Sequence, residues 1–88
     1  MYDVVFQKRA GQDYLFFARH NKDIRKRIDE LIEDMRLTPF KGIGKPEMLK
    51  GNLHGHWSRR ITDKHRLVYR VSANTIYIYF CRGHYDVD

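Results

Sequence analysis

The sequence predicts an α+β fold, with two helices packed on one face of a mainly antiparallel β-sheet in the order β-α-α-β-β-β. Three observations predict this class. Apolar residues recur at helical spacing between residues 7 and 37, three later segments are rich in β-branched and aromatic residues, and a short alternating segment opens the chain. At 88 residues, the chain is expected to form a single domain over residues 1–88.

The first three elements follow from spacing and capping signals. Tyr2, Val4 and Phe6 alternate with their neighbours and predict a short strand. A first helix is expected over about residues 7–19. Asn21 is a suitable N-cap for a second helix, which should end near residue 37 because the proline at position 39 disfavours helical geometry just before it. The apolar stripe of this second helix consists of Ile24, Ile28, Leu31, Ile32 and Met35.

Residues 38–56 form a long connection that holds both prolines and four of the six glycines. A connection of nineteen residues in so small a domain is unusual unless it has a function. Three strands are expected after it, over residues 57–62, 66–71 and 75–81, with hairpin loops at 63–65 and 72–74. Alternation along the middle strand places Leu67, Tyr69 and Val71 toward the helices and its arginines on the opposite face.

Composition excludes several classes of protein. Cys81 is the only cysteine, so the chain has no internal disulfide framework and no four-cysteine zinc site. With no secretory leader in the sequence, a cytoplasmic location is expected. The apolar runs are far shorter than the roughly 20 residues of a membrane-spanning helix, so no membrane partner is expected.

The net charge of +6 comes from the middle third of the chain. Residues 41–70 hold eight basic and two acidic residues, and four of the five histidines follow Lys50. Such a concentration is typical of a surface that meets phosphates or an acidic protein. A basic face that contacts only solvent has the same composition, so charge alone does not decide between these alternatives.

Groups that bind phosphate and groups that stack on bases occur together in the second half of the chain. The basic candidates are Lys45, Lys50, Arg60, Arg66 and Arg70, and the aromatic candidates are Tyr77, Tyr79 and Tyr85. Cationic groups beside aromatic rings suit single-stranded nucleic acid. Aromatic residues on strands also pack in cores, and this is the structural alternative.

Cleavage of RNA without a metal requires a base for the 2′-hydroxyl, a cation beside the phosphate and an acid for the leaving 5′-oxygen. Glu47 and His84 are candidates for the base and the acid, although a loop glutamate between two lysines is also a common solvated ion partner. Acidic residues after position 40 are too dispersed for a two-metal carboxylate site. We therefore expect no metal and no cofactor.

Three other motifs are not expected to form a metal site, a nucleotide-binding loop or a nucleophile. His54-x-His56 has metal-like spacing but no neighbouring cysteine or carboxylate. The segment Gly42-Ile43-Gly44-Lys45 follows a helix rather than a strand and lacks the spacing of a nucleotide-binding loop. Cys81 is expected to be a small buried residue rather than a nucleophile.

Four segments together resemble the YoeB/Txe branch of the RelE superfamily. They are residues 38–50, residues 52–62 with Trp57-Ser-Arg-Arg-Ile61, residues 65–69, and Cys81-Arg-Gly-His84-Tyr85. The resemblance implies a RelE-like microbial ribonuclease architecture. It also implies a toxin of a type II toxin-antitoxin system, an endoribonuclease that cuts messenger RNA in the ribosomal A site.

The same resemblance implies roles for individual residues. Glu47 would be the general base, Arg66 the cation that stabilises the transition state, and His84 the general acid. Tyr85 would orient or stack the substrate, and Lys50 and Arg60 match positions that hold phosphate. Family members often end at the His-Tyr pair, and we expect the extra residues 86–88 to point away from it.

The partners implied by the resemblance are an acidic YefM/Axe-like antitoxin, the ribosome with its mRNA, and a second copy of the chain in a homodimer. Operator DNA would be contacted only through the antitoxin complex. Two other classes of function stay open. One is a noncatalytic RNA- or ribosome-binding inhibitor of translation, and the other is an interaction subunit whose basic surface serves only an acidic partner. The joint occurrence of Glu47, Arg66, His84 and Tyr85 favours the enzyme.

Overall fold

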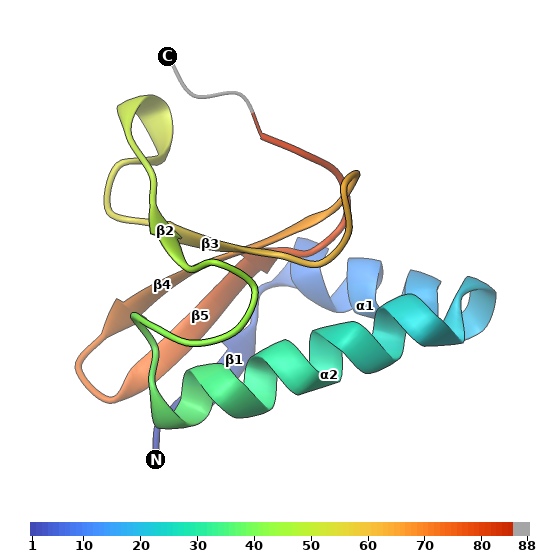
Figure 1. Ribbon diagram of the computed structural model, residues 1–88, viewed down its shortest axis with the longest axis horizontal. Coiled ribbons are helices and arrows are strands. Elements are labelled where there is room, and N and C mark those ends of the chain that lie inside the picture. Colours follow the sequence, from blue (N-terminus) through green and yellow to red (C-terminus); the bar gives the residue numbers. More distant parts are fainter. Residues whose placement is uncertain (86–88) are drawn as a thin grey trace.

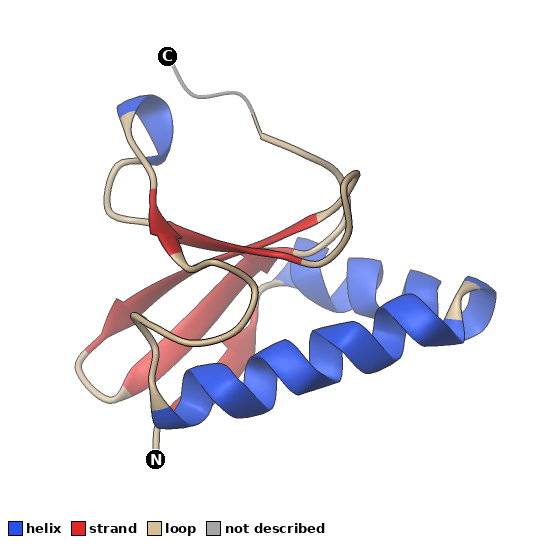
Figure 2. Ribbon diagram, viewed as in Figure 1, coloured by secondary structure: helices blue, strands red, loops and turns tan. Residues whose placement is uncertain are grey.

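Two helices cover one face of a five-stranded sheet in the computed structural model of the protein (Figure 1). The structure describes residues 1–85, so the expectation for residues 86–88 lies outside the described residues. The strands are β1 (Asp3–Phe6), β2 (Glu47–Met48), β3 (Trp57–Arg60), β4 (Arg66–Ser72) and β5 (Thr75–Phe80). They lie in the order β1-β5-β4-β3-β2, with β1 parallel to β5 and all other pairs antiparallel (Figure 2). The predicted fold class is confirmed.

The helices α1 (Lys8–His20) and α2 (Lys22–Leu37) meet at Asn21. Asn21 caps α2 as predicted, because its side-chain oxygen accepts a hydrogen bond from the Ile24 N–H at 3.2 Å. The end of α2 at Leu37 also agrees with the prediction. The apolar helix residues buried against the sheet are Ala10, Phe17, Ile28, Leu31 and Met35.

The segment between α2 and β3 differs from the predicted loop. It contains β2 and a short 3-10 helix, η1 (Gly51–Leu53). A two-residue strand is too short to show a period of two, so its sequence gives no signal. Strand β3 ends two residues earlier than predicted, because Oγ1 of Thr62 accepts hydrogen bonds from the N–H groups of Lys64 and His65 and closes a turn. The loop after β4 is one residue shorter than predicted, since Ser72 pairs with Thr75.

A bulge near the end of β5 gives the sheet a second apolar face. Val68 pairs with Phe80 and Tyr69 pairs with Ile78, so Tyr79 is one extra residue on β5. Phe80 consequently lies with Val68 on the sheet face opposite the helices, which we call the free face. The apolar cluster on the free face consists of Leu49, Val68 and Phe80, with Leu53 and Tyr85 packed against it.

Candidate active site

Strand pairing places the predicted polar residues on the free face. Cα pairing joins Glu47 to Ser58 and Ser58 to Val68 in one row across the sheet. Arg60 pairs with Arg66 in the next row. Directly opposed residues share a face, as do residues two apart on one strand. Glu47, Arg60 and Arg66 therefore lie on the same face.

Glu47 is exposed at the start of β2, on a strand rather than in the predicted loop. Its Cα is separated from that of Arg66 by two strand spacings across the sheet and by two residues along β4. In standard sheet geometry this is a distance of about 12 Å. The sheet edge thus presents an exposed carboxylate on the same face as Arg66.

The residues after β5 return across the free face and bring His84 to it. The backbone N–H of Arg66 donates to the Gly83 carbonyl at 3.0 Å. Nδ1 of His65 accepts a hydrogen bond from the Gly83 N–H at 2.8 Å. His84 follows directly and is exposed. Its position is therefore set by the backbone at the start of β4, next to the predicted cation.

Tyr85 links this segment to the β2–β3 pair. Its hydroxyl lies 3.0 Å from Oγ of Ser58, the residue paired with Glu47, and its ring stacks on that of His84 with centroids 5.2 Å apart. A pocket of about 280 Å³ forms at this place and is lined by Glu47, Met48, Leu49, Lys50 and Tyr85. The structure thus brings Glu47, Lys50 and Tyr85 together from two segments far apart in the sequence.

The guanidinium of Arg66 is bound to the turn before β4. Its Nη1 donates to the carbonyls of Thr62 at 2.5 Å, His65 at 3.2 Å and Asp63 at 3.4 Å. Within residues 1–85, its Nε and Nη2 make no hydrogen bond. The cation is therefore fixed at the rim of the free face while two of its nitrogens are available to a phosphate.

The four predicted RNA-binding residues, Lys45, Lys50, Arg60 and Arg70, are all exposed. Lys50 lines the pocket and Arg60 shares a row with Arg66, whereas Arg70 lies two positions beyond Val68, farther along β4. The guanidinium of Arg70 stacks on the Tyr77 ring at 4.6 Å from its centroid. Tyr79 is 46% exposed, as a base-stacking role would require. These groups extend the basic surface along the free face.

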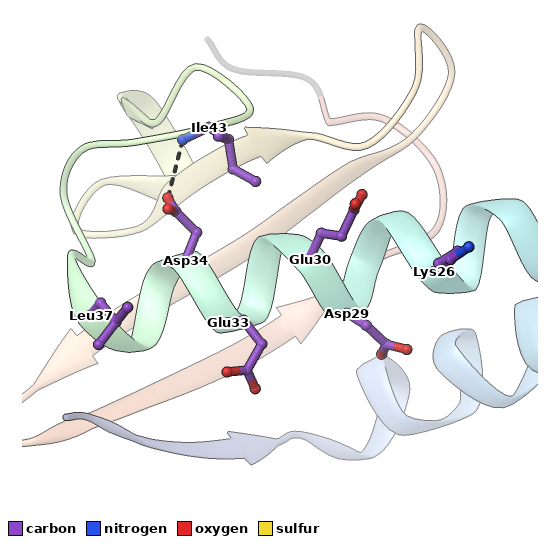
Figure 3. Close-up of a pocket in the computed structure, with 7 residues that line it drawn as sticks. All are labelled: Lys26, Asp29, Glu30, Glu33, Asp34, Leu37 and Ile43. Carbon is purple, nitrogen blue, oxygen red and sulfur yellow. Dashed lines mark hydrogen bonds between the residues drawn. The ribbon is translucent and has the colours of Figure 1, made fainter.

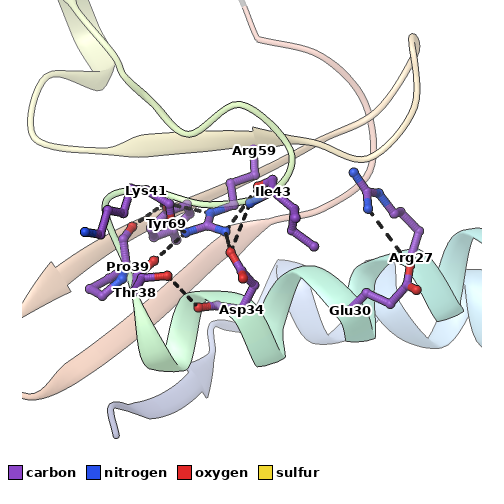
Figure 4. Close-up of polar contacts among 9 residues, drawn as sticks. All are labelled: Arg27, Glu30, Asp34, Thr38, Pro39, Lys41, Ile43, Arg59 and Tyr69. Atoms are coloured by element: carbon purple, nitrogen blue, oxygen red, sulfur yellow. Dashed lines mark hydrogen bonds and ion pairs between the residues drawn. The ribbon is translucent and has the colours of Figure 1, made fainter.

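Arg59 is an important residue that the sequence analysis missed. It alternates with Arg60, so it lies on the helix-covered face, where it is fully buried. Its Nη1 lies 2.6 Å from Oδ2 of Asp34, and its donors also reach the Tyr69 hydroxyl and the carbonyls of Thr38, Lys41 and Ile43 (Figure 4). The signal was the alternation of β3, in which Trp57 and Arg59 share a face.

This buried cation anchors residues 38–43, the segment that leads to Glu47. The hydrogen bond from Arg59 holds the pKa of Asp34 below its usual value, against the opposing effect of burial. Tyr69 completes the cluster by donating to the Pro39 carbonyl at 2.7 Å, and burial raises the pKa of its hydroxyl. One of the basic residues of the middle third is thus part of the core and adds nothing to the surface charge.

A larger pocket, about 540 Å³, lies between α2 and Ile43 on another part of the surface (Figure 3). It is lined by Lys26, Asp29, Glu30, Glu33, Asp34, Leu37 and Ile43. Each of its four carboxylates lies within 4.0 Å of an arginine nitrogen. The lining offers phosphate a single cation, Lys26, among four carboxylates that are already paired with arginines. The pocket beside Glu47 is therefore the better candidate for a site on RNA.

Cys81 is buried as predicted, and burial raises the pKa of its thiol to about 12, so it is a poor nucleophile at neutral pH. Within residues 1–85, no three His, Cys, Asp or Glu side chains are grouped so that they would hold a metal ion. Over the same part of the chain, no helix is long and apolar enough to cross a bilayer.

Comparison with known proteins identifies the family. Residues 6–85 match the family described as the YoeB-like toxin of bacterial type II toxin-antitoxin system. The chain belongs to this family. Toxin YoeB of Escherichia coli (strain K12) is 51% identical to it over 82 residues, which make up 93% of this chain and 98% of that protein. The resemblance seen in the motifs is thereby confirmed.

Solved structures of YoeB proteins have the same fold. The YoeB/ParE toxin from Agrobacterium tumefaciens superposes with a TM-score of 0.92 at 44% identity, covering 94% of this chain and 99% of that one. A YoeB chain in the YoeB-YefM complex from Staphylococcus aureus gives 0.87 at 44% identity, covering 97% and 99%. The YoeB dimer from Staphylococcus aureus gives 0.88 at 44% identity, covering 96% and 98%. All the candidate site residues of this YoeB-like chain, from Lys45 to Tyr85, lie within the matched range.

Proposed function

We propose that this YoeB-like toxin is a ribosome-dependent endoribonuclease that cuts mRNA in the A site and so inhibits translation. One observation carries the proposal: Glu47 and Tyr85, from two distant segments, line one open pocket, and the backbone bond between Arg66 and Gly83 brings the segment with His84 next to Arg66 on the same sheet. They supply a base, a cation, an acid and an aromatic ring, which is the set that metal-independent RNA cleavage needs. We further propose that residues 1–88 act as one domain.

The chemistry is an internal transfer of the phosphate. Glu47 takes the proton of the 2′-hydroxyl, and the 2′-oxygen attacks the adjacent phosphorus. As this bond forms, the bond from phosphorus to the 5′-oxygen breaks, and His84 gives a proton to the leaving oxygen. The products are a 2′,3′-cyclic phosphate and a 5′-hydroxyl. The proton removed by Glu47 and the proton lost by His84 balance, so no other reactant is needed.

Arg66 stabilises the charge that develops on the phosphate. Its guanidinium carries a fixed positive charge and two nitrogens without a partner in residues 1–85, and both can donate to phosphate oxygens. Lys50 and Arg60 flank the site and hold neighbouring phosphates. Arg66→Ala should therefore abolish most cleavage at little cost in stability, and Arg66→Lys should be a poor substitute because an ammonium lacks the planar fork.

The ribosome orients the mRNA for cleavage, which the protein alone does not do. Glu47 and His84 are both exposed, so nothing in residues 1–85 forces a flexible RNA to place its 2′-oxygen in line with the scissile bond. Orientation of the reacting groups contributes up to about 7–11 kcal/mol in favourable systems. An mRNA held in the A site is already constrained, and attraction between the basic face and ribosomal RNA speeds docking.

The partners follow from the family and from the charge. The protein has a net charge of +6, which suits an acidic antitoxin of the YefM/Axe type that folds on binding and covers the basic face. We extend to this chain the antitoxin complex and the homodimer named for the Staphylococcus aureus proteins. Operator DNA would be reached only through that complex, and the toxin would act in the cytoplasm, where ribosomes are.

Mapping of mRNA 5′ ends in a purified translation reaction tests the proposal. Wild-type protein should cut within the codon in the A site, and Glu47→Gln and His84→Gln should each slow cleavage about 10²- to 10⁴-fold. Matched controls are Glu33→Gln and His20→Gln, which change exposed residues on the helices and should cut at the wild-type rate. Inhibition of translation by all five proteins with the mRNA intact would instead support the noncatalytic inhibitor.

A further inference from the structure

We propose that His65 is a positioning residue for His84: its neutral imidazole holds the Gly83 amide, and protonation of His65 releases that contact. The inference deepens the proposed function, on which its catalytic half rests. It concerns a residue that lies outside the pocket and to which the sequence analysis gave no role in the site.

The backbone of Gly83 is held from both sides by two consecutive residues. Its N–H donates to Nδ1 of His65 at 2.8 Å, and its carbonyl accepts from the N–H of Arg66 at 3.0 Å. Its φ of +100° lies in a region that favours glycine. Because Gly83 has no side chain, only contacts of its backbone fix its position. The two hydrogen bonds therefore set the direction in which the chain enters His84.

His65 is itself fixed in place. Its ring packs edge-on against Phe17 of α1 with centroids 5.0 Å apart. The backbone N–H of His65 donates to Oγ1 of Thr62 at 3.1 Å, and its backbone carbonyl accepts from the N–H of Ile61 at 3.0 Å. The imidazole is consequently a rigid acceptor rather than a mobile surface group. Because Nδ1 accepts, the proton of the neutral ring is assigned to Nε2.

The charges around the ring favour this neutral state. Burial lowers the pKa of His65 most, and the cations of Arg82 and Lys64 lower it further. Asp13 on α1 acts in the opposite direction, and Phe17, the other α1 residue against the ring, carries no charge. The Arg66 guanidinium also lies close, since it donates to the carbonyl of His65. The ring thus remains an acceptor at neutral pH.

The neighbouring contacts of the C-terminal segment do not depend on this histidine. Arg9 donates to the carbonyl of Arg82 at 2.8 Å, and Oδ2 of Asp13 accepts from the N–H of Cys81 at 3.1 Å. These bonds hold residues 81–82 without involving the imidazole of His65. A protonated His65 has two N–H donors and no acceptor, so it repels the Gly83 N–H. Its protonation therefore removes one of the two hydrogen bonds that hold Gly83, immediately before His84.

Two variants separate the acceptor from the ring. His65→Asn places an oxygen near the position of Nδ1 but does not titrate, whereas His65→Leu provides no acceptor. His20→Asn, at the exposed end of α1, is the matched control. Thermal unfolding and far-UV circular dichroism establish that each variant is folded. If His65→Leu does not fold, the comparison of wild type with His65→Asn is sufficient to test the inference.

The first readout is the hydrogen-exchange protection of the Gly83 amide, which does not require any activity. In wild type this protection should fall about tenfold or more over the pH range in which NMR spectra show that the His65 ring becomes protonated. A change of this size is modest for the loss of one hydrogen bond. In His65→Asn it should stay constant over that pH range, and in His65→Leu it should be low throughout. Protection that does not change while the wild-type ring titrates would overturn the inference.

The second readout is cleavage of ribosome-bound mRNA as a function of pH. His65→Leu should lower kcat about 10- to 100-fold with little change in KM, as expected for a displaced acid. His65→Asn should recover most of this loss and move the acid limb of the profile to lower pH. If wild type cleaves and His65→Leu cleaves equally fast, the inference fails and the proposed function stands. If wild type does not cleave, the proposed function fails, and the exchange data alone decide the link between His65 and Gly83.

Discussion

The hydroxyl of Tyr85 and Oγ of Ser58 lie 3.0 Å apart, and this contact joins the C-terminal segment to the strand that pairs with Glu47. Ser58 is only 3% exposed, so its hydroxyl has little access to water as an alternative partner. The contact lies beside the pocket at Glu47, which Tyr85 lines. It makes the position of Tyr85 dependent on the sheet rather than on its neighbours in the chain.

Tyr85→Phe should lower the free energy of unfolding by about 0.5–1.5 kcal/mol, because it removes this hydrogen bond and keeps the ring. A double-mutant cycle with Ser58→Ala measures the contact in urea unfolding. The double variant should be hardly less stable than either single variant. Strictly additive losses would show that the two hydroxyls do not interact.

Arg59→Met should destabilise the protein by about 3–5 kcal/mol, since it leaves the carboxylate of Asp34 and several backbone carbonyls without their donor. The adjacent Arg60→Met is the control, because Arg60 is exposed and its loss should change stability by about 0.5 kcal/mol or less. Urea unfolding of the two variants gives the comparison. Similar effects of both substitutions would contradict the assignment of Arg59 to the core.

The stability supplied by Asp34 should disappear in acid. Its pKa is lower in the folded protein than the unfolded value of 3.8, so its contribution is fully present above pH 3.8 and is lost as pH falls through the folded pKa. The stability difference between wild type and Asp34→Asn should therefore be constant near neutrality and shrink below about pH 4. Glu33→Gln, on the exposed side of α2, is the control. A gap of the same size at pH 3 and pH 7 would rule out this ionisation.

Gly44→Ala should be destabilising by more than about 1 kcal/mol, because Gly44 has a φ of +79°. An added Cβ would also lie 2.7 Å from Cδ2 of Leu31 and 3.2 Å from the carbonyl oxygen of Arg60. Gly11→Ala in α1 is the matched control, since its Cβ meets nothing within 4 Å and alanine favours a helix. Thermal unfolding should show opposite signs for the two changes, and equal signs would argue against strain at Gly44.

Local patterns in the sequence predict the main helices and strands that carry the site, but not the short strand and the bulge that complete it. The stripe from Ile24 to Met35 and the alternation along β4 are periodic over enough residues to identify a buried helix face and the two faces of the sheet. The strand at Glu47 is too short to show any period. The bulge at Tyr79 is also absent from the pattern, because it becomes visible only when β4 and β5 are paired.

Long-range contacts explain the remaining differences. Charge composition does not distinguish Arg59 from Arg60, and the contact of Arg59 with Asp34 of α2 shows that Arg59 is an internal anchor. The family resemblance predicts roles for Glu47, Arg66 and His84, but it gives no reason why His84 should be held in place. That reason lies in the contacts of Gly83 with His65 and Arg66.

The most direct test of the account is single-turnover cleavage of one mRNA programmed into ribosomes with a vacant A site, in two forms. The first is all-ribose, and the second has a single 2′-deoxy nucleotide on the 5′ side of the cut. We predict that the first is cut at one place to give a 2′,3′-cyclic phosphate and a 5′-hydroxyl, and that the second is not cut there. Cleavage of both at equal rates, leaving a 3′-hydroxyl and a 5′-phosphate, would contradict the acid-base mechanism assigned to Glu47 and His84.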